Sequence, residues 1–461
     1  MSTAPASVAR THRRKTAVAL VAALTAIAAV LFLSPRRTQV RTAAGPASPY
    51  LSARLDSSHI MRGTTETYLA IALAAPDHRV TSRAPTSVAI VLDRSGSMLG
   101  QPWTDAVASA KVLIDKLGPD DELAIVAYST GADVVVPLGP ATGARRAEAK
   151  AAIDALTADG GTNLSGGLQL GADELARART PLRRMVLISD GQANEGIYDR
   201  AGLVRLAGKR AASGISITAV GVGLDFNEET MAGIAVAGRG NYHFVEDAAQ
   251  LGAMFVAELG SLGETVLTHA QLRVVPAPGV EVLDVIGYEL TRDGDAVLIP
   301  VADLRRGEHT KVVLRIRATV GDERVKELAH VTWSFEELGK GTRVHSAGAR
   351  AEVTGDASVV ASSRDKDTVR LVEEARTARA LEDASAAYHH GKLDQAQQIL
   401  RVRAAEAAAV AGELGDEALG ADIQTITGRV ERGFAAAPSA GAAEGKKALK
   451  GGRADAYQLA R

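Results

Sequence analysis

The chain has 461 residues, which is too long for one ordinary hydrophobic core and predicts two or three domains. Its apolar fraction of 46% and charged fraction of 23% are those of folded globular protein and argue against disorder throughout. A net charge of −1 and 3% aromatic residues offer no basis for nucleic-acid binding. The absence of cysteine excludes disulfides, thiolate metal sites and a cysteine nucleophile.

The N-terminal segment carries a targeting signal. Four basic residues within 1–15 precede an uncharged run from Thr16 to Leu33, which is just long enough to span a bilayer as a helix. A cleaved signal peptide is the alternative, but its apolar run is usually shorter and is followed closely by a small-x-small site. We favour an uncleaved single-pass anchor with a cytoplasmic N-terminus, by the positive-inside rule. The bulk of the chain would then lie outside the cytoplasmic membrane, in the cell envelope; secretion after signal cleavage is the alternative.

The next part of the chain changes from strands to a mixed pattern. Residues 51–75 alternate in the manner of strands, whereas from Thr86 to Leu262 short β-branched strands alternate with amphipathic helices. Buried strands alternating with helices predict a doubly wound, mostly parallel sheet of the Rossmann-like α/β class. Between Glu122–Ser129 and Val134–Leu138 the connection is too short for a crossover helix, so an antiparallel edge strand is expected there.

After Gly263 the pattern becomes all-β and then all-helical. Strand-like sequence on both sides of the α/β unit predicts one β-sandwich interrupted by an inserted domain. Residues 384–396 resemble one helix-turn-helix unit of the tetratricopeptide type. The tail is rich in Gly, Ala and Lys and is predicted to be disordered.

These patterns divide the chain into a cytoplasmic basic segment (1–15), an anchor or signal sequence (16–33), a linker (34–48), the first strands of the β-sandwich (49–83), the α/β domain (86–262), the remainder of the sandwich (264–355), a helical region (365–434) and a disordered tail (435–461).

A loop rich in oxygen-bearing side chains follows the first strand of the α/β domain. Asp93, Ser95 and Ser97 come directly after the apolar run Val88–Leu92. The carboxyl ends of strands are where ligands bind in open α/β sheets, because the loops of neighbouring strands converge there. Hard oxygen donors select hard cations. By itself this loop is also compatible with a plain turn.

Two further segments strengthen the metal interpretation. Thr162 opens a later helix among glycines, and Asp190 ends a later buried strand. Together these residues match Asp-x-Ser-x-Ser, then Thr, then Asp, and residues 86–260 thereby resemble the von Willebrand factor type A (VWA) domain with its metal-ion-dependent adhesion site. The Asp-x-Ser-Gly-Ser-Met loop and the N-terminal anchor resemble the bacterial envelope proteins of this class.

The resemblance implies roles for the five residues. Ser95 and Ser97 would bind the ion through their hydroxyls, Thr162 would bind it in one state of the loops, and Asp93 and Asp190 would act directly or through water. Neutral hydroxyl ligands leave the ion much of its charge, so a carboxylate from a partner can join it. Mg²⁺ suits such a site, with Ca²⁺ or Mn²⁺ as alternatives.

The partner implied is a protein that offers an Asp or Glu side chain. Arg94 within the metal loop and Trp103 just after it are candidate partner contacts, although packing of Trp103 against the first helix is an equal alternative. In the family, ligand binding is coupled to movement of the last helix, which would be Ala248–Leu262 here.

Other chemistries lack their motifs. No Gly-Lys-Ser or Gly-Lys-Thr loop is present for a nucleotide, and no Gly-x-Ser-x-Gly elbow supports a serine hydrolase, so no enzymatic activity is expected. The sequence predicts divalent-cation-dependent protein binding of the adhesion type. The alternative is a structural or assembly factor of the cell envelope in which the metal only stabilises the fold.

Overall fold

The computed structural model describes residues 49–77, 84–190, 192–223, 226–245, 264–437 and 439–461. The predicted anchor at 16–33, the linker at 34–48 and the expected last helix of the α/β domain at 248–262 lie outside the described residues. Among the helices that the structure describes, none combines the length and the apolar character needed to cross a bilayer.

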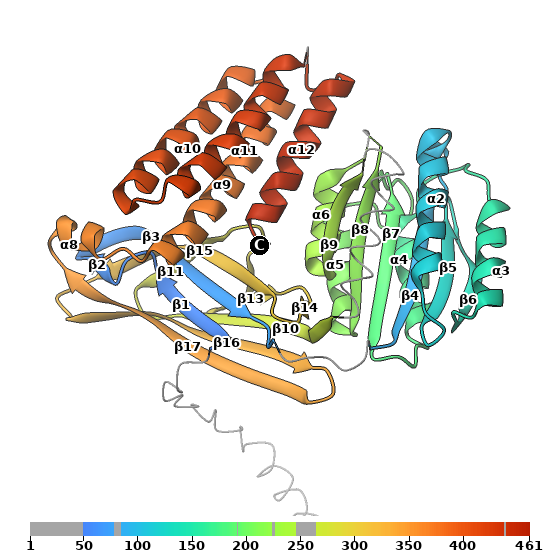
Figure 1. Ribbon diagram of the computed structural model, residues 1–461, viewed down its shortest axis with the longest axis horizontal. Helices are drawn as coiled ribbons and strands as arrows, with labels where there is room; N and C mark the ends of the chain where they lie inside the picture. The colour runs from blue at the N-terminus through green and yellow to red at the C-terminus, as the bar shows by residue number, and fades with distance from the viewer. Residues whose placement is uncertain (1–48, 78–83, 191, 224–225, 246–263, 438) are drawn as a thin grey trace, which may run out of the picture. The chain divides into compact units, whose positions relative to one another are not determined.

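Residues 86–245 contain a six-stranded sheet with helices on both faces (Figure 1). The strand order is β6-β5-β4-β7-β8-β9, parallel throughout except for the antiparallel edge strand β6 that the short connection predicted. The strands are β4 (Thr86–Asp93), β5 (Glu122–Tyr128), β6 (Ala132–Pro140), β7 (Leu182–Ser189), β8 (Ile215–Val222) and β9 (Arg239–Val245). The helices are η1 (Gly96–Met98), α2 (Gln101–Lys116), α3 (Gly143–Asp154), α4 (Leu164–Leu175), α5 (Arg200–Ala212) and α6 (Glu228–Ala237).

The period-2 geometry of β4 explains the two-faced packing. Val88, Ile90 and Leu92 face the core beneath α2 and α3, whereas Ala89 and Val91 face the core beneath α4, α5 and α6. All eight residues of β4 are buried, as expected for a central parallel strand. The carboxyl end of this strand is therefore held from both sides, which makes it a rigid support for a site.

Two further sheets are built from strands on both sides of residues 86–245. One has the order β1-β3-β15-β11 and the other β12-β13-β10-β16-β17-β2, with β14 paired to β10. The bounds are β1 (Leu51–Leu55), β2 (His59–Met61), β3 (Gly63–Ala74), β10 (Thr265–Pro276), β11 (Val280–Val285), β12 (Thr291–Asp293), β13 (Ala296–Pro300), β14 (Leu304–Arg305), β15 (His309–Val320), β16 (Val325–Glu337) and β17 (Gly341–Thr354). Buried residues of both sheets form one hydrophobic core.

The helical region packs on the outer face of the smaller sheet. Along β3, Leu69, Ile71 and Leu73 face the core shared by the sheets, whereas Ala70 faces Val372 and its neighbours on α9. The helices are α8 (Ala357–Ser362), α9 (Lys366–His389), α10 (Leu393–Leu414), α11 (Glu417–Ala436) and α12 (Ala443–Leu459), and the last four share a hydrophobic core (Figure 1).

The prediction of a disordered tail at 435–461 is wrong, because α12 occupies most of it. Leu449 and Ala456 of this helix belong to the core of the helical region. Glycine here serves close packing: a Cβ atom added at Gly452 would lie 3.1 Å from Val430 and 3.2 Å from Ser385. Composition alone cannot distinguish small residues that permit helices to approach from small residues that leave a chain without a core.

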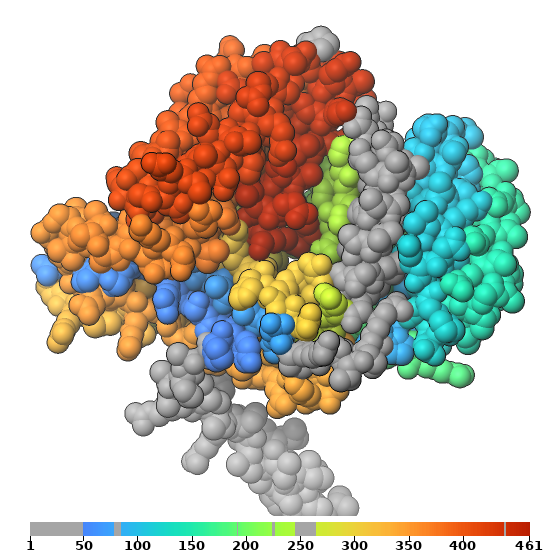
Figure 2. All heavy atoms as spheres, in the orientation of Figure 1, coloured from blue at the N-terminus to red at the C-terminus, as the bar shows by residue number. Residues whose placement is uncertain are grey.

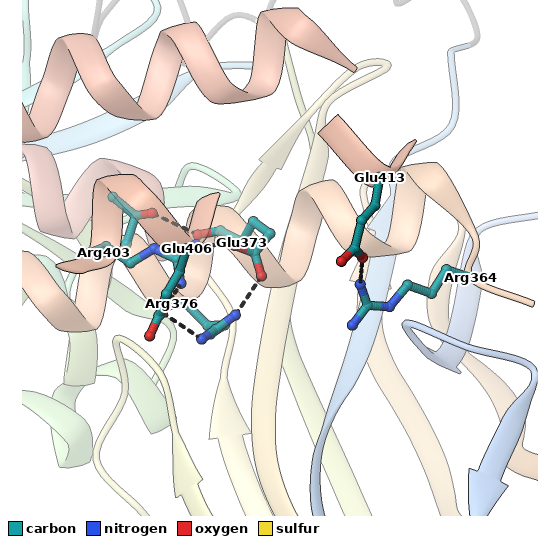
Figure 3. A network of polar contacts seen from close by, with 7 residues as sticks. Arg364, Glu373, Arg376, Arg403, Glu406 and Glu413 are labelled. Atoms are coloured by element: carbon teal, nitrogen blue, oxygen red, sulfur yellow. Dashed lines mark hydrogen bonds and ion pairs between the residues drawn. The ribbon is translucent and has the colours of Figure 1, made fainter. Parts of the chain in front are cut away.

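An ion pair buried between helices joins α9 to α10. The guanidinium of Arg403 donates to the carboxylate of Glu373 and, at 3.1 Å, to Glu406 (Figure 3). Arg376 donates to the same Glu373 at 2.8 Å and to Glu406 at 2.8 Å. Arg403 and Glu373 are both almost fully buried, so each depends on the other for compensation of its charge.

Replacing Arg403 by methionine is expected to lower the free energy of unfolding by about 3 kcal/mol, because Glu373 would stay buried with one cationic partner removed. Denaturant titration followed by circular dichroism measures this. Arg401→Met is the matched control, since Arg401 lies exposed on the same helix and its pair with Glu431 is worth less than about 1 kcal/mol. Equal losses in the two variants would contradict the assignment.

Candidate metal centre

Asp93 ends β4 with a fully buried carboxylate that three groups hold in place. The backbone N–H of Ser95 donates to Oδ1 at 2.9 Å, and the hydroxyls of Ser189 and Tyr128 donate to Oδ2 at 2.6 and 3.2 Å. Ser189 ends β7 and Tyr128 ends β5, the two strands that flank β4. The carboxylate orientation is therefore set by the carboxyl ends of three adjacent strands.

The two serines of the motif place their hydroxyls together. Ser95 Oγ and Ser97 Oγ lie 3.0 Å apart, with Ser95 buried and Ser97 exposed. Between them, Gly96 donates its N–H to Gly160 O at 3.0 Å, and a Cβ at Gly96 would lie 3.3 Å from that same oxygen. Glycine thus allows the Asp93 loop to approach the loop before α4 closely.

The loop that carries Thr162 is tied to both neighbouring loops. Asp159 N–H donates to Arg94 O at 2.8 Å, which links it to the Asp93 loop. On the other side, Thr162 N–H donates to Asn194 Oδ1 at 2.7 Å and Asn194 N–H donates back to Thr162 O at 3.1 Å. The loops bearing Asp93, Thr162 and Asp190 therefore meet at one edge of the sheet, as the order of the motif predicts.

Asp190 follows β7 and is also buried. Its carbonyl oxygen accepts a hydrogen bond from Asn227 N–H at 3.2 Å, which fixes its backbone to the segment before α6. Its negative charge is close enough to act on Asp93 and raises the pKa of that group. Two buried carboxylates thus share one region of low dielectric constant.

Burial is the main cause of an unusual pKa at Asp93. Desolvation raises the pKa from 3.8 to about 6; hydrogen bonds from Ser189 and Ser95 oppose this, and the charge of Asp190 adds to it. Within the described residues, neither carboxylate forms an ion pair with a lysine or arginine. Two buried acids beside the paired hydroxyls of Ser95 and Ser97, without a lysine or arginine partner among the described residues, fit a hard divalent ion.

The two predicted partner contacts are placed differently from the metal residues. Arg94 is held over the neighbouring loops, with its guanidinium 3.0 Å from Asp159 and 3.8 Å from Asp133. Trp103 is half-buried and packs against the core beneath α2. Both side chains therefore make contacts within the domain, and their contact with a partner stays a prediction.

The structure also identifies residues that the motif did not reveal. Ser189, Tyr128 and Asn194 orient the site, and their only sequence signal is a polar side chain at the end of a buried strand or soon after one. Leu99, directly after the metal loop, has 65% of its surface exposed, which is unusual for a large apolar side chain. In the sequence, only its position directly after the metal loop distinguishes Leu99 from other leucines.

Comparison with known proteins identifies the family of the α/β domain. Residues 87–257 match the family model described as von Willebrand factor type A domain, which confirms that the chain contains a domain of this family. The chain is 30% identical over 229 residues to "Uncharacterized protein YfbK" of Escherichia coli, a match that covers 48% of this chain and 39% of that protein. It is also 30% identical over 232 residues to "Uncharacterized protein sll0103" of Synechocystis sp., covering 50% of this chain and 54% of that protein.

The matched region thus spans about half or less of the length of these relatives. Among solved structures, "von Willebrand factor type A from Catenulispora acidiphila" is similar to this chain with a TM-score of 0.64 at 22% identity, covering 83% of this chain and 91% of that one. This likeness extends beyond residues 87–257 and concerns the fold.

Proposed function

We propose that the chain binds a protein partner through a divalent cation held by Asp93, Ser95, Ser97, Thr162 and Asp190. Domains of this family commonly mediate protein–protein interaction and typically hold a divalent metal. The observation that carries the proposal is the buried Asp93–Asp190 pair beside paired serine hydroxyls, without a cationic side chain of the described chain to compensate it. When bound, Mg²⁺ would supply a positive charge that a partner carboxylate can join.

Two sets of residues have different roles in the proposed metal site. Asp93 and Asp190 supply charge for the ion, while the hydroxyl groups of Ser189 and Tyr128 keep Asp93 oriented. Leu99 offers apolar surface beside the metal loop, where contact with a partner would remove it from water. The proposal includes an outward location of this domain through an N-terminal anchor at residues 16–33, as the sequence favours.

A pull-down of envelope proteins in Mg²⁺ or in chelator, with the parent chain, Asp93→Ala and Leu99→Ala, tests this function. A partner should be retained by the parent in Mg²⁺ and lost in chelator and in Asp93→Ala. Leu99→Ala should keep the Mg²⁺ affinity of the parent but should no longer retain the partner. If a specific partner stays bound in chelator, the metal serves only the fold, which is the structural alternative.

Metal affinity should depend on pH through Asp93. Below a pKa of about 6 its carboxyl holds a proton that the ion must displace, so Mg²⁺ affinity should fall about tenfold per pH unit below 6 and level off above it. The folded pKa lies above the unfolded value of 3.8, so the metal-free protein loses stability from this group as the pH rises between those values. Calorimetric titration from about pH 5 to pH 8 measures the affinity, and a flat profile would contradict the prediction.

A further inference from the structure

Helix α12 has a second face that contacts the α/β domain. Leu449 and Ala456 pack into the helical region, whereas Lys450, Arg453 and Tyr457 follow one another at spacings of three and four residues and so share another side of the helix. In Figure 2 the red atoms of the C-terminal helix lie against the green atoms of the α/β domain. All three side chains make polar contacts with that domain.

Lys450 is the centre of this contact and is almost fully buried. Its ammonium group donates to Phe226 O at 3.0 Å and to Glu228 Oε2 at 3.1 Å, and it lies 3.5 Å from the centroid of the Phe226 ring. A buried ammonium is costly unless it is fully compensated. Here a carbonyl, a carboxylate and an aromatic face supply that compensation together.

Arg453 and Tyr457 extend the contact along the helix. Arg453 donates to Glu228 at 2.5 Å and to Glu229 at 3.1 Å. The Tyr457 hydroxyl accepts from Tyr242 N–H at 3.2 Å and donates to Gly240 O at 3.3 Å, on strand β9. Burial raises the pKa of the Glu228 carboxyl, but Lys450 and Arg453 outweigh it and the net pKa is below the usual value. Glu228 is thus ionised and engaged by two cations of α12.

Residues 226–228, which Lys450 of α12 contacts, are also hydrogen-bonded to the proposed metal centre. Asn227 lies between Phe226 and Glu228, and its N–H donates to the carbonyl oxygen of Asp190 at 3.2 Å. Phe226 further packs on Phe244 of β9, with ring centroids 5.6 Å apart. Lys450 therefore holds both chain neighbours of the residue that positions the backbone of Asp190.

We propose that α12 is an intramolecular ligand of the α/β domain that raises its metal affinity by holding residues 226–228 against Asp190. This inference rests on the proposed metal function and adds a regulator to it. Docking of α12 orders one of the two carboxylates before the ion arrives, so less conformational freedom is lost on binding. Any factor that releases α12 would weaken the metal site from outside it.

Thermodynamic linkage gives the proposal a reciprocal consequence. If docked α12 tightens metal binding, bound metal must tighten the docking of α12 by the same factor. Saturating Mg²⁺ should therefore slow hydrogen exchange of the α12 amides in the parent chain. It should leave the same amides unchanged in Asp93→Ala.

The direct test compares Mg²⁺ affinity of the full chain with Lys450→Met and Lys392→Met, measured by isothermal titration calorimetry. Lys450→Met should weaken binding by about 5- to 50-fold, within the usual range of coupling between two sites. Lys392 is the matched control, because it is exposed at the start of α10 in the same helical region, and its replacement should change the affinity by less than about twofold. Circular dichroism checks that each variant is folded.

The outcomes separate the two proposals. Parent-like affinity in Lys450→Met, together with faster exchange of residues 226–237, would overturn the coupling and leave the metal site standing. A parent chain that takes up no Mg²⁺ would overturn both. Should Lys450→Met fail to fold, the milder pair Arg453→Gln and Tyr457→Phe removes polar contacts of α12 at its less buried end and is expected to weaken Mg²⁺ binding in the same direction.

Discussion

Replacing Asp93 by alanine is expected to abolish the stabilisation that Mg²⁺ gives to the protein. In the parent, a ligand at about 100 times its dissociation constant adds roughly 2.7 kcal/mol to the free energy of unfolding. The variant lacks the most deeply buried carboxylate of the site, and three donors that held it, Ser95 N–H among them, are left without their acceptor. Thermal unfolding with and without Mg²⁺ measures the difference.

Asp133→Ala is the control for this experiment. Asp133 lies on β6 with its side chain largely exposed and contacts Arg94 only at 3.8 Å, so its loss should leave the Mg²⁺-dependent gain intact. The five-residue assignment would be wrong if Asp93→Ala kept the gain seen in the parent. Loss of the Mg²⁺-dependent gain in stability in both variants would instead indicate that Mg²⁺ binds to general surface charge.

The second large effect is expected at Trp333, which lies on β16 and is fully buried in the core shared by the two sheets. Its ring packs against Phe335 at 4.4 Å and His345 at 6.2 Å between centroids. Trp333→Ala should lower the free energy of unfolding by about 3–5 kcal/mol, since it removes the largest buried side chain and leaves a cavity. Differential scanning calorimetry is the measurement.

Trp333→Phe separates packing from hydrogen bonding. The indole N–H of Trp333 has no hydrogen-bond partner within the described part of the chain, so phenylalanine removes a buried unsatisfied donor while keeping an aromatic ring. Its expected cost is below about 1.5 kcal/mol. A phenylalanine variant as unstable as the alanine variant would show that the site depends on the indole itself rather than on filled volume.

The sequence predicted the α/β architecture because its signals are local. The β-branched run before Asp93 predicts a strand, and the amphipathic runs between the later strands predict helices, each from a few neighbouring residues. The edge strand β6 was predicted from a connection too short for a helix. The alternation of strands and helices, together with the motif, predicted that the Asp93, Thr162 and Asp190 loops lie at the carboxyl edge of the sheet.

What surrounds the motif could not be predicted in the same way. Ser189 and Tyr128 reach Asp93 only because β7 and β5 flank β4, and a serine or tyrosine at a strand end has many other uses. Arg94 was predicted as a partner contact, yet the structure pairs it with Asp133 of strand β6 and Asp159 of the loop before α4. Such assignments depend on distances between segments far apart in the chain.

Residues 435–461 show most clearly which features the sequence determined and which only the tertiary structure decided. By itself the sequence determined the strand and helix periods, the metal-type motif and the absence of cysteine chemistry, because each is written in residue type and spacing. Only the tertiary structure decided that residues 443–459 form a helix in which Lys450 is buried against Glu228. A Gly- and Lys-rich segment has too little apolar surface to order alone, so this helix gains its stability from packing on the helical region and from its contacts with the α/β domain.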